Sequence, residues 1–306
     1  VPVPLLTGYS TSLQNLGKVN NRGWELALTS QHTFTNGFGY SFNANYAKNT
    51  NEVKELGPGN APIISSGSVG HAYYITEVGK PIGNYYLLVQ DGIFATEEDL
   101  KKYPHFDNTE VGDFRFVDVD GDGKLDLDKD RTICGNYMPK FTYGFGGKLW
   151  YAGFDMDFNF QGVYGNKILN LNKRYLDNME GNTNGTKIAL DRWKSPENPG
   201  SGSVNKANRK QTGYNSRTST WHLESGSYLR LQNLSLGYTL PRALTQKFKV
   251  EKMRVYVSGQ NLFTITNYSG YNPEVNARPS KNLTPGEDYG TYPLARTYMF
   301  GLNLTL

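Results

Sequence analysis

Separated segments of the sequence alternate strictly between apolar and polar side chains, and only a β-strand turns a period of two residues into two chemically different faces. In residues 38–46 every second residue is aromatic or alanine, and those between are glycine, serine or asparagine. In residues 154–161, Phe154, Met156, Phe158 and Phe160 alternate with Asp155, Asp157, Asn159 and Gln161. Residues 297–306 follow the same rule. The pattern predicts strands with one apolar and one polar face.

Weaker alternation occurs in four further segments, 24–31, 141–151, 228–240 and 253–257. In residues 228–240 the alternation changes phase near Asn233, which indicates a β-bulge or a register shift. The sequence therefore predicts about seven strands, several of them close to the length of about ten residues that a tilted transmembrane β-strand needs.

The connections between these strands alternate in length. They are short at 32–37 and 151–153 and moderate at 241–250, but long at 50–139, 165–226 and 263–295. Successive antiparallel strands would place every long connection at the same end, as in outer-membrane barrels, which have short periplasmic turns and long extracellular loops. The predicted fold is all-β: a partial transmembrane antiparallel β-barrel with long extracellular loops. Within one of these loops, the spacing of Ile168, Leu171, Tyr175 and Met179 predicts a short amphipathic helix.

Composition agrees with this fold and excludes several classes of function. Mean hydropathy is −0.58 and no apolar run approaches the roughly 18 residues of a spanning helix, whereas a barrel exposes apolar side chains on one face only. The 32 basic and 28 acidic residues are interspersed, which argues against nucleic acid as a partner. Cys134 is the only cysteine, so it has no disulfide partner within the chain, and we expect an inert thiol.

No catalytic constellation is present, and we predict that the chain is not an enzyme. The four histidines lack metal-ligand spacing, and no G-x-S-x-G elbow occurs. Asp155 and Asp157 lie two residues apart on one strand face, with no neighbour in sequence that would raise the pKa of either carboxyl.

Six stretches carry a resemblance to a known family. They are NNRGWELAL (20–28), GKPIGNYYLLVQDGIF (79–94), residues 112–145, DRW followed by PENP (191–199), SYLRLQNLSLGYTLP (227–241) and residues 255–275. In these stretches the chain resembles the SusC/RagA-type TonB-linked outer-membrane transporters of Bacteroidetes.

The resemblance implies a barrel of about 22 strands, of which residues 1–306 would supply the C-terminal part, without the plug domain and the TonB box. It further implies import of oligosaccharides or peptides across the outer membrane. The partners implied are a SusD-like surface lipoprotein, TonB acting through the missing plug, and outer-membrane lipid. An alternative hypothesis is a secreted, calcium-stabilised, β-rich carbohydrate-binding module, in which the apolar strand faces would meet each other in a dry core.

Residues 118–130, DVDGDGKLDLDKD, begin like an EF-hand loop. Carboxylates would come from Asp118, Asp120, Asp122 and Asp126, with the backbone carbonyl of Lys124 between them. Position twelve is Lys129, but the resemblance implies that Leu127 is an insertion and that Asp130 is the matching ligand. We expect a structural Ca²⁺ ion here, and the alternative is an acidic, solvated turn.

Aromatic residues in the long loops are the remaining candidates for ligand binding: Tyr73, Tyr74, Tyr85, Tyr86, Trp193, Trp221, Tyr268 and Tyr271. Such rings stack on sugars or dock peptides, but they also serve as ordinary packing. Both interpretations are open from the sequence.

Overall fold

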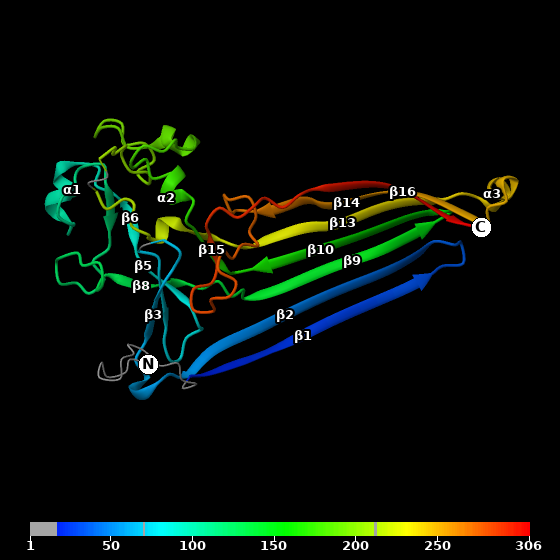
Figure 1. The fold of residues 1–306 in the computed structure, drawn as a ribbon, viewed down its shortest axis with the longest axis horizontal. Coiled ribbons are helices and arrows are strands. Elements are labelled where there is room, and N and C mark those ends of the chain that lie inside the picture. The colour runs from blue at the N-terminus through cyan, green and yellow to red at the C-terminus, as the bar shows by residue number, and fades with distance from the viewer. Residues whose placement is uncertain (1–16, 70, 211–212) are drawn as a thin grey trace, which may run out of the picture.

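A seven-stranded antiparallel sheet with a large cap at one end dominates the structure (Figure 1). This computed structural model describes residues 17–69, 71–210 and 213–306. The seven strands are β1 (Lys18–Thr33), β2 (Gly39–Glu55), β9 (Phe141–Tyr151), β10 (Phe154–Tyr164), β13 (Tyr228–Thr239), β14 (Lys252–Thr266) and β16 (Thr297–Thr305). We call this the wall sheet. The wall sheet contains every predicted strand. Its strands pair in the order in which they occur along the chain, β1-β2-β9-β10-β13-β14-β16.

The register of the wall sheet separates an apolar face from a polar one. Met156 pairs with Leu149 on one side and Leu236 on the other, and the row continues through Val257 to Phe300. Most residues in the rows of the opposite face are polar or small, as in Asn43, Gly146, Asn159, Asn233 and Gln260. The row of Asp155 also carries the large rings of Trp150 and Tyr256. The predicted alternation is therefore confirmed across the strands.

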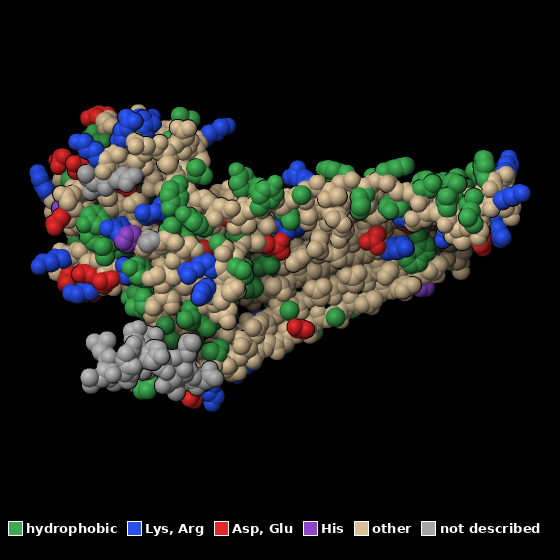
Figure 2. All heavy atoms as spheres, viewed as in Figure 1, with side chains coloured by type: hydrophobic (Ala, Val, Ile, Leu, Met, Phe, Trp, Pro, Cys, Tyr) green, Lys and Arg blue, Asp and Glu red, His purple; other side chains and the backbone are tan. Residues whose placement is uncertain are grey.

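The apolar face is exposed, with relative accessibilities of 64% at Phe154 and 83% at Phe300. From Phe154 to Tyr164, β10 spans about 34 Å along the strand. At the tilt of about 40° common in barrels this gives about 26 Å along the membrane normal, close to the 25 Å apolar band of outer-membrane proteins. Within the described residues no second sheet covers this face, so the dry core required by the carbohydrate-binding-module alternative is not formed. Figure 2 shows apolar side chains along the sheet.

The phase change predicted near Asn233 is a bulge. Asn159 pairs with Asn233 but Phe160 pairs with Leu231, so Gln232 is the extra residue. The bulge keeps Leu231 and Leu234 on the same apolar face. The sheet is not closed: within the described residues β1 and β16 each pair on one side only.

The cap consists of the described parts of residues 56–140, 165–227 and 267–296. Its elements are η2 (Pro58–Asn60), β3 (Ile63–Ser66), β4 (Tyr73–Thr76), β5 (Asn84–Leu88), β6 (Gln90–Ile93), α1 (Glu97–Lys102), β7 (Phe114–Phe116), β8 (Arg131–Gly135), β11 (Lys167–Asn170), α2 (Lys173–Leu176), η3 (Lys187–Asp191), η4 (Thr220–His222), β12 (Leu223–Ser225) and β15 (Glu287–Asp288). All three long connections thus lie at one end, as predicted, and the opposite end carries only short turns and the small helices α3 (Arg242–Thr245) and η5 (Gln246–Phe248).

The helix predicted through Ile168 and Met179 is wrong over most of its length. Only α2 is helical, and Ile168 lies in β11, fully buried, where it pairs with Glu224 of β12. Contacts between distant loops favour a strand here over the helical periodicity. No helix in the described ranges is long and apolar enough to cross a membrane.

Three apolar clusters hold the cap together. The first contains Ala72, Tyr74, Tyr85, Leu87, Leu169 and Leu171. The second contains Leu88, Ile93, Phe106, Phe114 and Phe116, with Trp193, Tyr214 and Trp221 packed against it. The third joins Ile168 to Tyr268 and Val275. Because the clusters combine residues from all three long connections, the cap is one folded unit over the end of the wall sheet.

Candidate functional site

The polar face of the wall sheet presents hydrogen-bonding groups at regular spacing. Asp155 on β10 accepts two hydrogen bonds from Arg254 on β14, at 2.8 and 2.5 Å. Gly237 on the strand between them pairs with Asp155 and leaves the space that Arg254 crosses. Asp157, Asn159 and Gln161 follow along β10 and are at least partly exposed. Since Asp155 is bound by a guanidinium, it does not form a catalytic pair with Asp157.

The third long connection folds over this polar face near the cap. Arg230, which pairs with Gln161 and is 5% exposed, donates to Asn272 Oδ1 at 2.8 Å and forms an ion pair with Glu274. The hydroxyl of Tyr228 donates to the same Glu274 carboxylate at 2.5 Å. These contacts fix residues 272–274 over the inner side of the wall.

Glu287 links the third connection to the first. Its side chain is fully buried and accepts hydrogen bonds from the Ser68 N–H (3.1 and 3.0 Å), the Ser68 hydroxyl and the Tyr74 hydroxyl (3.1 Å). The Tyr85 hydroxyl, on the first connection, donates to the carbonyls of Lys167 and Gly286, at 3.1 and 3.0 Å. This hydroxyl therefore joins all three connections, because Lys167 belongs to the second and Gly286 to the third. Burial raises the pKa of Tyr74 above its ordinary value, so that hydroxyl stays a donor.

Three of the eight aromatic candidates are part of the cap core. Tyr74 and Tyr85 are 0% exposed and Tyr268 is 5% exposed, with its hydroxyl donating to Asp288 at 2.5 Å. In this structure these three rings serve as packing, because they have little or no accessible surface.

The other five candidates retain some accessible surface. The indole N–H of Trp193 donates to the Ala95 carbonyl (3.2 Å), and the Lys173 ammonium lies 4.2 Å from the ring centroid of Trp221. The Arg131 guanidinium lies 3.8 Å from the ring centroid of Tyr73. Tyr86 is half-buried and Tyr271 is 81% exposed. Tyr271 thus offers the largest free ring among the candidates.

The acidic loop at residues 118–130 brings together three carboxylates. One ligand oxygen each of Asp118, Asp120 and Asp130 lies within 4.8 Å of the others. Asp130 is fully buried and accepts from the Val119 N–H (2.7 Å) and the Asp126 N–H (2.6 Å). Asp118 accepts from the N–H groups of Gly123 and Gly121, and these bonds lower the pKa of its carboxyl.

The remaining predicted ligands lie outside this group of three. Asp122 forms an ion pair with Lys129 (3.7 Å), and Asp126 accepts from the N–H groups of Asp128 and Lys129. Lys124 donates its N–H to Asp122 Oδ1 at 2.9 Å. Three of the six predicted ligands, Asp118, Asp120 and Asp130, thus lie close together in the structure.

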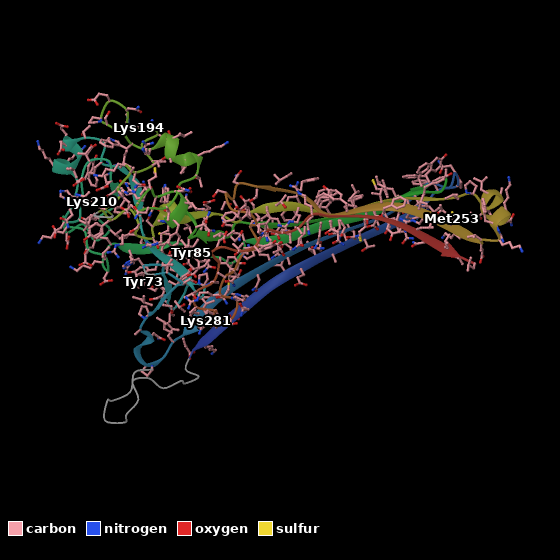
Figure 3. The ribbon with its side chains drawn as sticks, turned by 45° about the horizontal axis from the view of Figure 1, so that its top comes forward. Tyr73, Tyr85, Lys194, Lys210, Met253 and Lys281 are labelled. Atoms are coloured by element: carbon pink, nitrogen blue, oxygen red, sulfur yellow. The ribbon has the colours of Figure 1, made fainter. Side chains whose placement is uncertain are left out.

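A cleft of about 990 Å³ between α1 and the acidic loop was not predicted from the sequence. Tyr103, Phe106 and Tyr214 line it, and the rings of Phe106 and Tyr214 stack with centroids 4.3 Å apart. The only sequence signal was the aromatic pair in YPHF at residues 103–106. Figure 3 shows how densely side chains fill the surrounding cap.

Cys134 lies partly buried against the first cluster, and burial raises the pKa of its thiol to about 11, as expected of an inert cysteine.

An open antiparallel sheet with an apolar outer face, a polar inner face and all long connections at one end defines part of an outer-membrane β-barrel. No protein-family model matches the chain. TonB-dependent receptor P3 of Formosa agariphila is 34% identical over 316 residues, a match that covers 99% of this chain and 30% of that receptor. SusC of Bacteroides thetaiotaomicron is 26% identical, with coverage of 99% of this chain and 28% of SusC.

The solved structure of the RagAB peptide importer in its closed-closed state has a TM-score of 0.74 at 25% identity, over 99% of this chain and 31% of that one. The chain thus spans about a third of the length of the proteins it matches. These findings confirm the resemblance to SusC/RagA-type TonB-dependent receptors, and with it the outer-membrane location. The relatives are named receptors and an importer, which agrees with the prediction that the chain is not an enzyme.

Proposed function

We propose that the chain forms part of the wall and the extracellular cap of a TonB-dependent importer for oligosaccharides or peptides. The observation that carries the proposal is the position of the cap, which gathers all three long connections at the end of a sheet whose inner face is polar. Cargo would pass from the cap toward this face.

The chemistry of both regions suits hydroxyl-rich or amide-rich cargo. Asp157, Asn159 and Gln161 offer donors and acceptors along β10, and Tyr271 offers an exposed ring for stacking. Energy for import would come from TonB through a plug domain outside this chain. A SusD-like lipoprotein would cover the cap from the extracellular side.

We further propose a structural Ca²⁺ ion on the acidic loop. Asp118, Asp120 and Asp130 fit a hard cation, since each offers a carboxylate oxygen and the three converge. Asp122, Asp126 and the Lys124 carbonyl would supply further oxygens. Leu125 and Leu127 of the same loop pack against the second apolar cluster, so an ion here would brace the cap.

Growth of the native bacterium tests the import proposal. Deletion of the full receptor gene should abolish growth on one glycan or peptide source, and restoration of the gene should recover it. Tyr271→Ala should reduce growth on that source, whereas Tyr298→Ala, which removes a 71% exposed ring from the outer face, should not. Unchanged growth of the deletion strain on every such source, with loss only of iron-chelate or cobalamin uptake, would overturn the substrate class.

A further inference from the structure

The connection between β13 and β14 forms a basic turn at the end of the sheet opposite the cap (Figure 1). We call residues 240–252 the basic turn. It carries Arg242, Lys247, Lys249 and Lys252 against the single acid Glu251, a net charge of 4 − 1 = +3. All four cations are exposed, and none of them has an ion pair within 4.0 Å among the described residues. The turn therefore offers unneutralised positive charge.

The same turn exposes two large apolar side chains. Leu244 is 48% and Phe248 is 74% exposed, while Thr245 and Val250 are buried at 1% and 8%. Leu244 and Phe248 are four residues apart across α3 and η5, a spacing that places them on one side. Exposed apolar side chains beside free cations are typical of segments that lie in the membrane interface.

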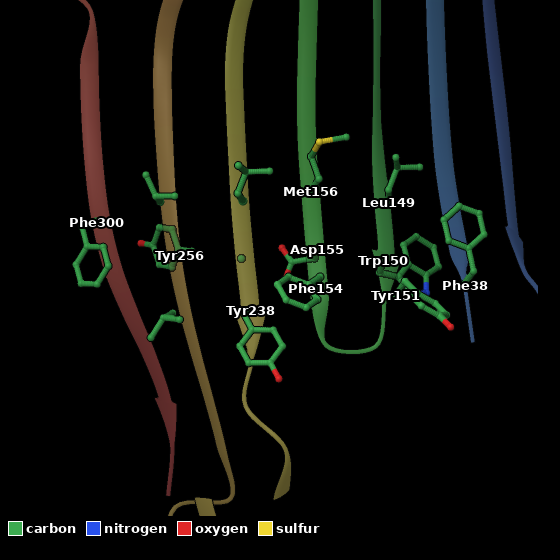
Figure 4. A pocket seen from close by; sticks show the side chains of 14 residues that line it. Phe38, Leu149, Trp150, Tyr151, Phe154, Asp155, Met156, Tyr238, Tyr256 and Phe300 are labelled. Atoms are coloured by element: carbon green, nitrogen blue, oxygen red, sulfur yellow. The ribbon is translucent and has the colours of Figure 1, made fainter. Parts of the chain in front are cut away.

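An apolar groove of about 490 Å³ runs across the strands directly above this turn (Figure 4). Phe38, Tyr151, Phe154, Tyr238 and Phe300 line it. The rings of Phe154 and Tyr238 lie with centroids 4.5 Å apart. Aromatic rings at this height correspond to the girdle that barrels place at the boundary between hydrocarbon and headgroups.

The distance between groove and cations matches the thickness of a headgroup layer. Val255 lines the groove, and the basic turn ends at Lys252, three residues earlier on β14, which is about 10 Å along the strand. At a tilt of about 40° this is about 8 Å along the membrane normal. The polar layer on each side of a bilayer is about 5 to 8 Å thick. The turn thus joins β14 at the depth of lipid phosphates when the groove lies in hydrocarbon. Lys252 itself shares the inner face with Arg254, so it marks the depth of the turn and is not a lipid contact.

We propose that this end of the wall sheet binds an anionic phospholipid of the periplasmic leaflet. Its acyl chains lie along the aromatic groove, and its phosphate lies against Arg242, Lys247 and Lys249. Leu244 and Phe248 insert beside it. The charge of the turn selects an anionic headgroup over a zwitterionic one, because the phosphate of a zwitterionic lipid is already balanced by its own cation.

Native mass spectrometry of the intact receptor tests this proposal. The receptor is released from mixed micelles that contain equal amounts of phosphatidylglycerol and phosphatidylcholine, and the two retained lipids are compared. Wild type should retain phosphatidylglycerol preferentially. In the variant Arg242→Gln/Lys247→Gln/Lys249→Gln the ratio of retained phosphatidylglycerol to phosphatidylcholine should fall about fivefold for each cation removed, on the order of 100-fold in all. Salt should weaken the preference, since the turn is exposed.

Two further variants separate charge from folding. Lys101→Gln/Lys102→Gln/Lys194→Gln removes the same number of exposed cations from the cap and should keep the preference. Leu244→Ser/Phe248→Ser should lower retention of both lipids about equally and keep the ratio. An unchanged ratio in the triple variant of the turn, or no preference in wild type, would overturn the proposal. Because import is measured separately, normal uptake by the triple variant would leave the proposed function intact.

Discussion

Substitution of Glu287 should loosen the cap without affecting the wall sheet. Glu287→Gln retains the shape of the side chain but replaces the buried carboxylate by a neutral amide. Three donors lose a charged acceptor: the Ser68 N–H, the Ser68 hydroxyl and the Tyr74 hydroxyl. A hydrogen bond to a charged group contributes about 1 kcal/mol more than a neutral one, so the loss is about 3 kcal/mol. The contact between the first and third connections should therefore open more often.

Hydrogen exchange of the intact receptor in detergent measures this opening. A change of about 3 kcal/mol corresponds to an increase of about 150-fold in the exchange rate of β3 and β4, if local opening governs exchange there. Strands β10 and β13 should be unaffected. Tyr74→Phe is the matched control, because it removes one of the three donors and leaves the carboxylate, and it should increase exchange by about tenfold. Exchange of β4 within threefold of wild type in Glu287→Gln would refute the reasoning.

Three other predictions concern the cap and the sheet. Titration calorimetry should detect Ca²⁺ binding to the receptor. Asp118→Asn and Asp130→Asn should each weaken the Ca²⁺ affinity at least about tenfold. Asp107→Asn, which changes an exposed acid outside the loop, should leave the affinity unchanged. Absence of heat with wild type would contradict the site. Burial, with Lys173 and Arg174 nearby, lowers the pKa of His222 to about 3, so the unfolded cap binds more protons than the folded cap below about pH 6.5. The cap should therefore lose stability as the pH falls below about 6.5, at about 1.4 kcal/mol per pH unit. Burial, with Arg217 nearby, also lowers the pKa of His71 in the cap to about 4, so proteolysis of the cap should show at least that slope. His222→Asn should reduce the slope by about 1.4 kcal/mol per pH unit; an unchanged slope would argue against a contribution of His222. Residues 1–306 alone should not refold into a heat-resistant monomeric barrel, since β1 and β16 leave open edges that lipid does not tolerate. A monomer whose mobility on a gel changes on heating, as that of a folded barrel does, would contradict this prediction.

The strands of the wall were predictable because their signal is local. Alternation between Phe154 and Gln161 already separates the lipid-facing side from the inner side, and pairing with β9 and β13 only extends that separation across the sheet. Even the bulge at Gln232 was visible as a change of phase. The lengths of the connections then placed all three loops at one end.

The cap was not predictable in the same way, since its residues have no common period. Tyr73 and Tyr74 are neighbours in sequence, yet Tyr74 is fully buried on Glu287 while Tyr73 keeps accessible surface beside Arg131. Ile168 belongs to a strand although its spacing to Leu171 and Tyr175 is helical. In the acidic loop the residue types predicted a cation site, but the structure brings together Asp130 and not Asp126 with Asp118 and Asp120.

The sequence by itself determined the strands of the wall, the chemistry of their two faces and the end at which the long connections lie, because each of these depends on residues within one strand or on chain length between strands. Only the tertiary structure decided which loop aromatics pack and which remain exposed, and which carboxylates converge. The physical reason is the separation of the contacts that decide it. Tyr74 donates to Glu287, 213 residues away, and packs in the first apolar cluster with Leu169 and Leu171 of the second connection, contacts that its neighbours in sequence do not reveal.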